Sequence, residues 1–210
     1  DLTKKYSNIY ASVGVHPDYE DIQEPDIDIL FKYSKDKKIV AIGETGLDYF
    51  RLKGDLSWQR DRFRTHIRAA IKSKLPLIIH TRNAQDDTIS IMKEEGANSA
   101  TGVMHCFTES YEMAKQAIDL GFYISFSGII TFKNAETLRE TVKKIPIENI
   151  LIETDSPYLA PVPNRGKLNE PANVRYVAEK ISELKGIPVE KVAEITTNNF
   201  FKLFSKCKTL

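Results

Sequence analysis

Six short apolar segments recur along the chain, with amphipathic sequence between them. They span residues 9–15, 39–44, 75–80, 101–107, 121–128 and 150–155. Rich in Ile, Val and Leu, they are too apolar for a sheet with one face in water, and they indicate parallel strands covered on both faces. Their ends fall near residues 15, 44, 80, 105, 127 and 155. This spacing favours the strand–helix units of a (β/α) barrel, although a doubly wound open sheet gives a similar spacing.

The segments between the strands have the period of amphipathic helices. The clearest has an apolar inner face formed by Phe63, Ile67, Ala70 and Ile71. Its basic outer face is formed by Arg60, Arg64 and Arg68. Further helices are expected at 110–121, with Gly121 as the stop signal, and at 134–145, with Asn134 as N-cap. Residues 171–186 and 188–204 predict two more helices, each with a proline early, where it is tolerated.

The chain length and charge limit the class of protein. With 210 residues, 41% of them hydrophobic, the sequence predicts one barrel domain over residues 1–210. The net charge of +1 does not indicate a nucleic-acid or membrane partner, so any anion recognition must be local. Cys106 and Cys207 form no disulfide framework, and no stretch approaches the ~20 apolar residues of a membrane span. We therefore expect a cytoplasmic protein with no membrane association and no obligate protein partner.

Ionisable residues stand at the ends of four predicted strands: Glu44, His80, His105 and Asp155, with His16 just after the first strand. In a parallel barrel the carboxyl ends of all strands converge on one rim, where active sites are built. These side chains can therefore meet. Two imidazoles and two carboxylates form a ligand set suited to Zn²⁺, Mn²⁺, Fe²⁺ or Mg²⁺. Taken singly, each has a structural explanation, a hydrogen-bonded histidine or a capping carboxylate, but four on four strands favour a metal site.

Other polar residues carry weaker signals. The arginine stripe 60, 64 and 68 is explained by a solvated helix face, and Cys106 by a small buried side chain rather than a soft ligand. Arg82 extends past the rim just after His80, where a guanidinium could clamp a phosphate. Tyr158 and Arg165 lie on a proline-rich loop over the same rim, where they could contact substrate or simply pack the loop.

Five motifs together resemble a known family. They read "GVHP", "AIGETGLDY", "LPLIIHTR", "GVMHCF" and "ETDSPYLAP" followed by "RGKLNEP". In order and spacing they are similar to the motifs of the TatD-type metal-dependent deoxyribonucleases, which are TIM-barrel hydrolases related to the amidohydrolases. The resemblance covers essentially the whole chain. It implies hydrolysis of DNA phosphodiester bonds with divalent metal ions (Mg, Mn or Zn), of exonuclease or repair type.

The resemblance also implies roles for particular residues. Glu44 matches the carboxylate that bridges two metals, and His80 and His105 match the imidazoles that complete one metal site. Asp155 matches the aspartate beside the attacking water, as ligand and base. The positions near the substrate are His16, Arg82, Tyr158 and the pair Asn169–Glu170.

One departure from the family concerns the beginning of the chain. The family opens with a strand carrying a His-x-His pair that holds the other metal, whereas the histidines here are His16, His66, His80 and His105. We expect a barrel with about six of eight strand–helix units, the N-terminal two missing, since a complete barrel typically has about 250 residues. One metal rather than two could then be bound.

Two alternatives to a deoxyribonuclease stay open from the sequence. A related barrel hydrolase of a small amide, ester or lactone would use the same ligands. A truncated, inactive remnant would serve only as a folded module. The leading hypothesis is metal-activated water, with Asp155 as base and Arg82 offsetting the charge on the phosphate.

Overall fold

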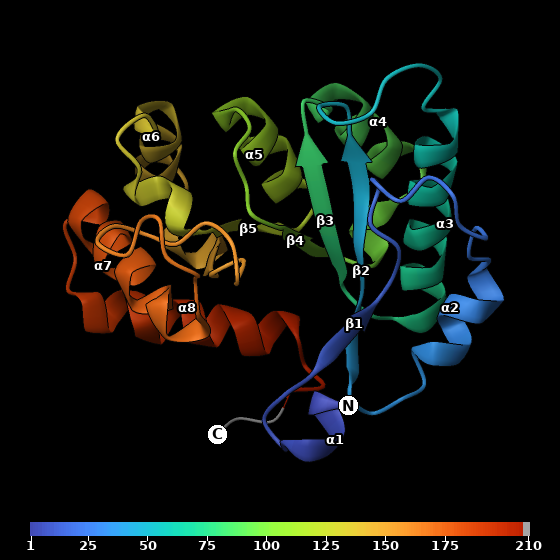
Figure 1. The fold of residues 1–210 in the computed structure, drawn as a ribbon, viewed down its shortest axis with the longest axis horizontal. Coiled ribbons are helices and arrows are strands. Elements are labelled where there is room, and N and C mark those ends of the chain that lie inside the picture. The colour runs from blue at the N-terminus through green and yellow to red at the C-terminus, as the bar shows by residue number, and fades with distance from the viewer. Residues whose placement is uncertain (208–210) are drawn as a thin grey trace.

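The fold is built on one six-stranded parallel sheet (Figure 1), seen in a computed structural model that describes residues 1–207. The strands are β1 (Ala11–Val13), β2 (Ile39–Asp48), β3 (Leu77–Arg82), β4 (Gly102–Met104), β5 (Phe122–Phe126) and β6 (Ile150–Ile152). Their spatial order follows the chain, β1-β2-β3-β4-β5-β6, and every neighbouring pair is parallel. A doubly wound sheet reverses its strand order at a switch point, so the sequential order corresponds to the barrel alternative.

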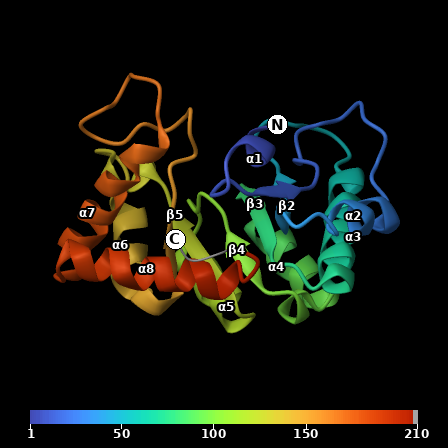
Figure 2. The same ribbon diagram turned by 90° about the horizontal axis from the view of Figure 1, so that it is seen from below.

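Helices form an arc around the outer face of the curved sheet (Figure 2), each packed against the next along the chain from α2 to α8. The α-helices are α1 (Leu2–Lys5), α2 (Ile27–Tyr33), α3 (Ser57–Ser73), α4 (Gln85–Glu94), α5 (Tyr111–Asp119), α6 (Glu136–Lys144), α7 (Val174–Lys185) and α8 (Val189–Leu203). Short 3₁₀ turns complete the chain: η1 (Ala97–Ser99), η2 (Gly128–Thr131), η3 (Ile147–Asn149) and η4 (Pro171–Asn173). This arrangement of strands and helices is that of a (β/α) barrel, with β1 and β6 as open edges among the described residues.

Both faces of the sheet are apolar, as the strand composition predicts. The larger cluster lies between sheet and helices and includes Ile42, Phe63 and Ile124. The smaller cluster lies on the other face of the sheet, where Ala41 and Tyr123 belong to the same strands as Ile42 and Ile124 but alternate with them. The end of the chain supplies further members of the smaller cluster, namely Leu203, Phe204 and Cys207.

The predicted helices agree with the structure except at two starts, one of which is that of α7, where residues 171–173 form the 3₁₀ turn η4. On α3 the predicted inner residues Phe63, Ile67 and Ala70 are buried, and Ile71 is partly buried against the same core. Gly121 after α5 has φ +82°. The prediction of Asn134 as the N-cap of α6 is wrong, because Ala135 stands there. The chain turns first: the amide of Ala135 donates to the carbonyl of Phe132, so the helix begins after this turn.

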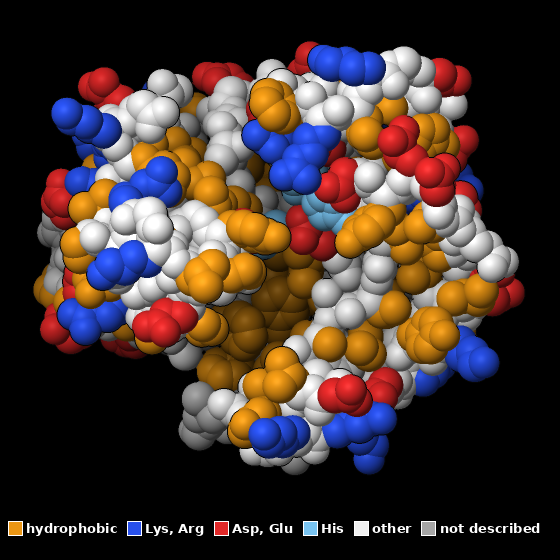
Figure 3. All heavy atoms as spheres, in the orientation of Figure 1, with side chains coloured by type: hydrophobic (Ala, Val, Ile, Leu, Met, Phe, Trp, Pro, Cys, Tyr) orange, Lys and Arg blue, Asp and Glu red, His pale blue; other side chains and the backbone are white. Residues whose placement is uncertain are grey.

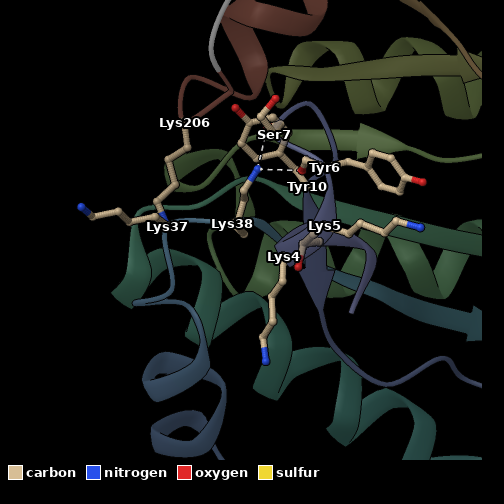
Figure 4. Close-up of a pocket in the computed structure, with 9 residues that line it drawn as sticks. Lys4, Lys5, Tyr6, Ser7, Tyr10, Lys37, Lys38 and Lys206 are labelled. Atoms are coloured by element: carbon tan, nitrogen blue, oxygen red, sulfur yellow. Dashed lines mark hydrogen bonds between the residues drawn. The ribbon is translucent and has the colours of Figure 1, made fainter.

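Two lysines fasten the amino-terminal end of the sheet. Lys38 Nζ donates to the carbonyls of Tyr6 at 3.3 Å and Ser7 at 2.6 Å (Figure 4). It also donates to the carbonyl of Ile9 at 3.1 Å. Lys206 Nζ, near the end of the chain, donates to the carbonyls of Ser34, Asp36 and Ile39. Both line a cavity of about 690 Å³ at the end of the sheet opposite the predicted metal ligands. Among the described residues no helix is both long enough and apolar enough to cross a membrane.

Candidate metal centre

Glycines let β2 bend toward β3 around Glu44. The register between these strands shifts between Ile42 and Thr45. The sequence predicted that this strand ends at Glu44, but β2 continues to Asp48. Gly46 has φ +135°, and a Cβ on it would lie 1.9 Å from the carbonyl oxygen of His80. Only glycine fits such a close approach at this φ. The backbone contact therefore holds the segment around Glu44 against the segment around His80.

Three imidazoles surround one oxygen of Glu44. Oε1 lies 3.2 Å from Nδ1 of His80, 3.3 Å from Nε2 of His16 and 3.7 Å from Nε2 of His105. Asp155 completes the cluster, with Oδ1 3.5 Å from Nε2 of His105. Figure 3 shows histidine and acidic side chains gathered in a hollow of the surface, with basic side chains beside them. The structure thus brings together the four predicted ligands and adds His16, which the resemblance implied only as a position near the substrate.

The other ring nitrogen of each imidazole faces a second carboxylate. The pairs are His16–Asp18, His80–Asp48 and His105–Glu153. A neutral imidazole has a single N–H, and when that N–H donates to the outer carboxylate the inner nitrogen carries a lone pair. Three lone pairs directed at one carboxylate oxygen repel one another, and each also repels the oxygen. A proton or a metal cation between them removes this repulsion. Histidine–carboxylate pairs of this kind fix the ring orientation of metal-binding histidines.

The His105 end of the site contains further carboxylates. Nδ1 of His105 lies 3.0 Å from both oxygens of Glu153, but Oε1 of Glu153 is buried and accepts no hydrogen bond among the described residues. Cys106 is partly buried beside it, with Sγ 3.2 Å from the hydroxyl of Ser127. Burial and the nearby Glu153 raise the pKa of this thiol, so it stays protonated and is a poor ligand.

Two sets of side chains have the spacing of a metal site. Their ligand atoms lie within 4.8 Å of one another, and the sets are His16, Glu44 and His80, and His105, Glu153 and Asp155. Five carboxylates, Asp18, Glu44, Asp48, Glu153 and Asp155, face three imidazoles, so negative charge is in excess even if every imidazole is protonated. The donor set and the orphaned oxygen of Glu153 fit a divalent cation.

The pKa directions show that the carboxylates and imidazoles of this cluster favour each other's charged forms. Burial alone would raise the pKa of Glu44, but hydrogen bonds from His16 and His80 lower it well below its usual range. Burial alone would lower the pKa of His105, but the carboxylates of Glu153, Asp155 and Glu44 raise it to about 11. The carboxylates around His105 therefore stabilise positive charge at that end of the site.

The remaining predicted positions lie around this cluster rather than in it. The guanidinium of Arg82 stacks on Phe50 at 3.9 Å, and that of Arg165 stacks on Phe132 at 3.7 Å. Tyr158 is 70% exposed. The backbone amide of Tyr158 donates to the carbonyl of Asp155 at 2.9 Å. Among residues 1–207 no side-chain hydrogen bond or ion pair joins these three residues to the metal-ligand candidates.

The remaining weak signals of the sequence have structural explanations. Asn169 is buried, and its amide donates to the carbonyls of Thr154 and Tyr158, so it orders the loop that carries Asp155. Glu170, the other member of the pair, is exposed. The arginine stripe of α3 contacts acidic residues and a tyrosine of neighbouring segments, as expected for a solvated face: Arg60–Tyr49, Arg64–Glu94 and Arg68–Glu95.

Sequence reasoning missed the outer carboxylates. Asp48 lies four residues after Glu44, and Glu153 two residues before Asp155, so each was present in a quoted motif. An acidic residue near a strand end is usually a cap or a salt-bridge partner, and only the pairing with an imidazole distinguishes it. The signal that could have found them is a second carboxylate within four residues of each predicted carboxylate ligand, Glu44 and Asp155.

The fold and the site define a class of protein: a (β/α)-barrel hydrolase that depends on a divalent metal ion. The comparisons with known proteins identify the family within this class. Residues 1–205 match the family described as "TatD related DNase". The chain belongs to the TatD family of metal-dependent hydrolases, and the resemblance stated from the motifs is confirmed.

Individual relatives give the extent of the similarity. The chain is 48% identical to the uncharacterized metal-dependent hydrolase YcfH of Escherichia coli K12, covering 97% of this chain and 77% of that protein. It is also 48% identical to the uncharacterized metal-dependent hydrolase YabD of Bacillus subtilis, covering 97% and 80%. Among solved structures, the TatD homolog YjjV of Escherichia coli K12 superposes with a TM-score of 0.86 at 29% identity, covering 97% of this chain and 80% of that chain.

Proposed function

We propose that this hydrolase cleaves phosphodiester bonds of DNA, as a deoxyribonuclease of exonuclease or repair type. The observation that supports the proposal is the convergence of His16, His80 and His105 on Oε1 of Glu44, with Asp155 beside them. Such a site suits hydrolysis of a charged ester, because a cation held there offsets negative charge developing on a phosphate. The matching family carries the description DNase, which favours DNA as the substrate.

The chain's own residues divide the work of the reaction. Glu44, His80, His105 and Asp155 would hold the divalent ion, with His16 beside them. When bound, the ion lowers the pKa of a coordinated water and polarises the phosphoryl oxygen. The Asp155 side chain is 30% exposed, so its carboxylate is accessible to a water molecule and can accept its proton. The outer carboxylates keep the imidazoles oriented through the reaction.

Arg82 is the candidate phosphate ligand. It is the last residue of β3, two residues after His80, and its guanidinium stacks on the ring of Phe50. Among residues 1–207 no carboxylate forms an ion pair with it, so its N–H groups remain available for phosphate oxygens. Arginine presents a planar pair of donors that matches phosphate geometry.

Cleavage of labelled single-stranded DNA tests the proposal. The purified chain is incubated with Mn²⁺ or Mg²⁺, beside Glu44→Ala and the exposed control Asp61→Asn. We expect metal-dependent cleavage by the wild-type chain and by Asp61→Asn, and at least a 100-fold slower reaction for Glu44→Ala. Equal cleavage by all three would refute the site.

Parallel assays separate the alternative substrates. Small amides, esters and lactones are offered under the same conditions. Turnover of one of these, with DNA left intact, would make the deoxyribonuclease proposal wrong while leaving a metal-dependent hydrolase. Binding to DNA should also weaken steeply with rising salt, because phosphate contacts release counterions.

A further inference from the structure

Helix α3 reaches the loop that carries His16 with two buried side chains. His66 is 0% exposed and Arg62 is 2% exposed, and they lie one turn apart on the face of α3 toward this loop. Neither belongs to the metal centre. Both bind the backbone at residues 15 and 16. Polar side chains buried this deeply need hydrogen-bond partners. Here the partners include the backbone of residues 15 and 16, the segment that carries the candidate ligand His16.

The contacts of His66 fix its tautomer. The amide of Val15 donates to Nε2 at 3.0 Å, so Nε2 carries the lone pair. Nδ1 must then carry the proton, and it donates to the carbonyl of Arg62 at 2.8 Å. Both ring nitrogens are used by the neutral imidazole. The ring therefore joins the backbone of α3 to the amide immediately before His16.

Arg62 holds the next backbone group along the loop. Its Nη1 donates to the carbonyl of His16 at 3.1 Å. Nε donates to Glu24 at 2.8 Å, Nη2 contacts the other oxygen of Glu24, and the guanidinium lies 4.6 Å from the ring of Trp58. The guanidinium cannot move freely, because it is clamped by a bidentate carboxylate and stacked on an indole.

The loop needs such support because β1 gives little. β1 has three residues and, within the described chain, pairs only with β2. His16 lies three residues beyond its end, and the side chain of His16 is oriented by Asp18 from the same loop. The His16 ring can face Glu44 only if the backbone at residues 15 and 16 is held in place. The two α3 side chains bind an amide and a carbonyl of this backbone.

We propose that Arg62 and His66 are positioning residues that hold the His16 imidazole in the metal centre. The inference rests on the proposed metal site, in which His16 faces Glu44. Supporting side chains behind a metal ligand typically change metal affinity 10–100-fold when removed. The alternative is that His66 and Arg62 only stabilise the fold. Their removal would then weaken metal binding no more than an equally destabilising substitution elsewhere in the chain.

A double-mutant cycle in Co²⁺ binding distinguishes the two roles. The full chain is titrated with Co²⁺, following visible absorption and heat, for wild type, His16→Ala, His66→Leu and the double variant. We expect His66→Leu to weaken Co²⁺ binding at least 10-fold, and the double variant to equal His16→Ala within about twofold, since coupled residues are not additive. The variant His66→Gln should bind within about threefold of wild type, because an amide can accept from Val15 and donate to Arg62.

Controls keep each outcome decisive. Arg64→Leu removes ion pairs from the exposed side of α3 and should leave Co²⁺ binding unchanged. If His66→Leu does not fold, Arg62→Met enters the same cycle. Wild-type Co²⁺ affinity in His66→Leu would overturn the positioning role. So would a loss of Co²⁺ affinity from His66→Leu that is as large in the His16→Ala variant as in the wild-type chain. A wild-type chain that binds no Co²⁺ would overturn the metal centre as well, so the two failures are distinguishable.

Discussion

Nε2 of His80 lies 3.0 Å from Oδ2 of Asp48, a carboxylate whose other oxygen is held by the amides of Phe50 and Arg51. Asp48 is 1% exposed. The carboxylate therefore cannot swing away, and the ring of His80 is held with its other nitrogen toward Glu44. The same arrangement, an outer carboxylate on one ring nitrogen and Glu44 facing the other, occurs at His16 and His105. The site consists of an inner ring of ligands and an outer ring of acids.

The variant Asp48→Asn should lose metal affinity while keeping its fold. The amide oxygen can still accept from Phe50 and Arg51, but an N–H₂ group would then face Nε2 of His80. That nitrogen becomes the acceptor, so the proton moves to the nitrogen facing Glu44, where it competes with the metal. We expect a 10–100-fold weaker metal Kd by calorimetry and a matching fall in hydrolysis.

The exposed variant Asp61→Asn is the control for Asp48→Asn. Asp61 lies on α3, away from the metal centre, and its carboxylate faces Arg64 at 3.9 Å. The substitution should leave the metal Kd unchanged. A metal Kd of Asp48→Asn within twofold of wild type would show that the outer carboxylate does not orient His80.

The variant Gly46→Ala should destabilise the fold by at least about 2 kcal/mol, because backbone strain and a steric clash coincide. A Cβ there would lie 1.9 Å from the carbonyl oxygen of His80, at φ +135°. Gly54→Ala is the matched control: Gly54 also has positive φ, at +92°, but a Cβ on it would meet nothing within 4 Å. It should cost only about 1 kcal/mol. Urea unfolding measures both, and equal losses would contradict the close-approach argument.

The extent to which the sequence predicted the fold depends on how local each signal is. Strands buried on both faces are visible as unbroken apolar runs, and Glu44, His80, His105 and Asp155 stand out because polar residues interrupt such runs. The continuation of β2 to Asp48 was missed, because the register shift between Ile42 and Thr45 depends on the neighbouring strand. Glycine in a strand signals a bulge or a close approach, but not which one.

The placement of His16 could not be predicted for a related reason. Its ring faces Glu44 because the backbone around it is held by side chains of α3, some fifty residues later in the chain. Loop conformations set by such distant contacts leave no periodic signal in the sequence. The resemblance located His16 near the substrate, and the geometry makes it a candidate ligand.

Acid should destabilise the protein through His66. Burial is the main cause that lowers the pKa of His66 from 6.5 to about 4. The hydrogen bond to the backbone of Arg62 and the charge of Glu24 oppose this shift, while the charge of Arg62 adds to it. Between these two pH values the unfolded chain binds more protons than the folded chain, so the free energy of unfolding falls as pH drops from about 6.5 to about 4. One such group contributes about 3 kcal/mol over this range.

Comparison with His66→Gln isolates this contribution. Glutamine can make both hydrogen bonds and does not titrate, so the variant should gain about 2 to 3 kcal/mol relative to wild type between pH 7 and pH 4. Urea unfolding at several pH values measures the difference. Parallel stability curves for the two proteins would show that His66 is not buried as a neutral ring.

Metal binding should stabilise the fold, and the increment should depend on Glu44. A ligand that binds only the folded chain adds about 2.7 kcal/mol at a concentration 100 times its Kd. We expect the thermal midpoint of the wild-type chain to rise with added Mn²⁺ and to fall back with chelator. In Glu44→Ala the increment should be nearly absent, because the oxygen facing all three imidazoles is gone. The comparison uses the difference between metal-loaded and chelated protein within each variant, so a change in the stability of the metal-free fold cancels. An undiminished increment in Glu44→Ala would mean that the metal binds elsewhere.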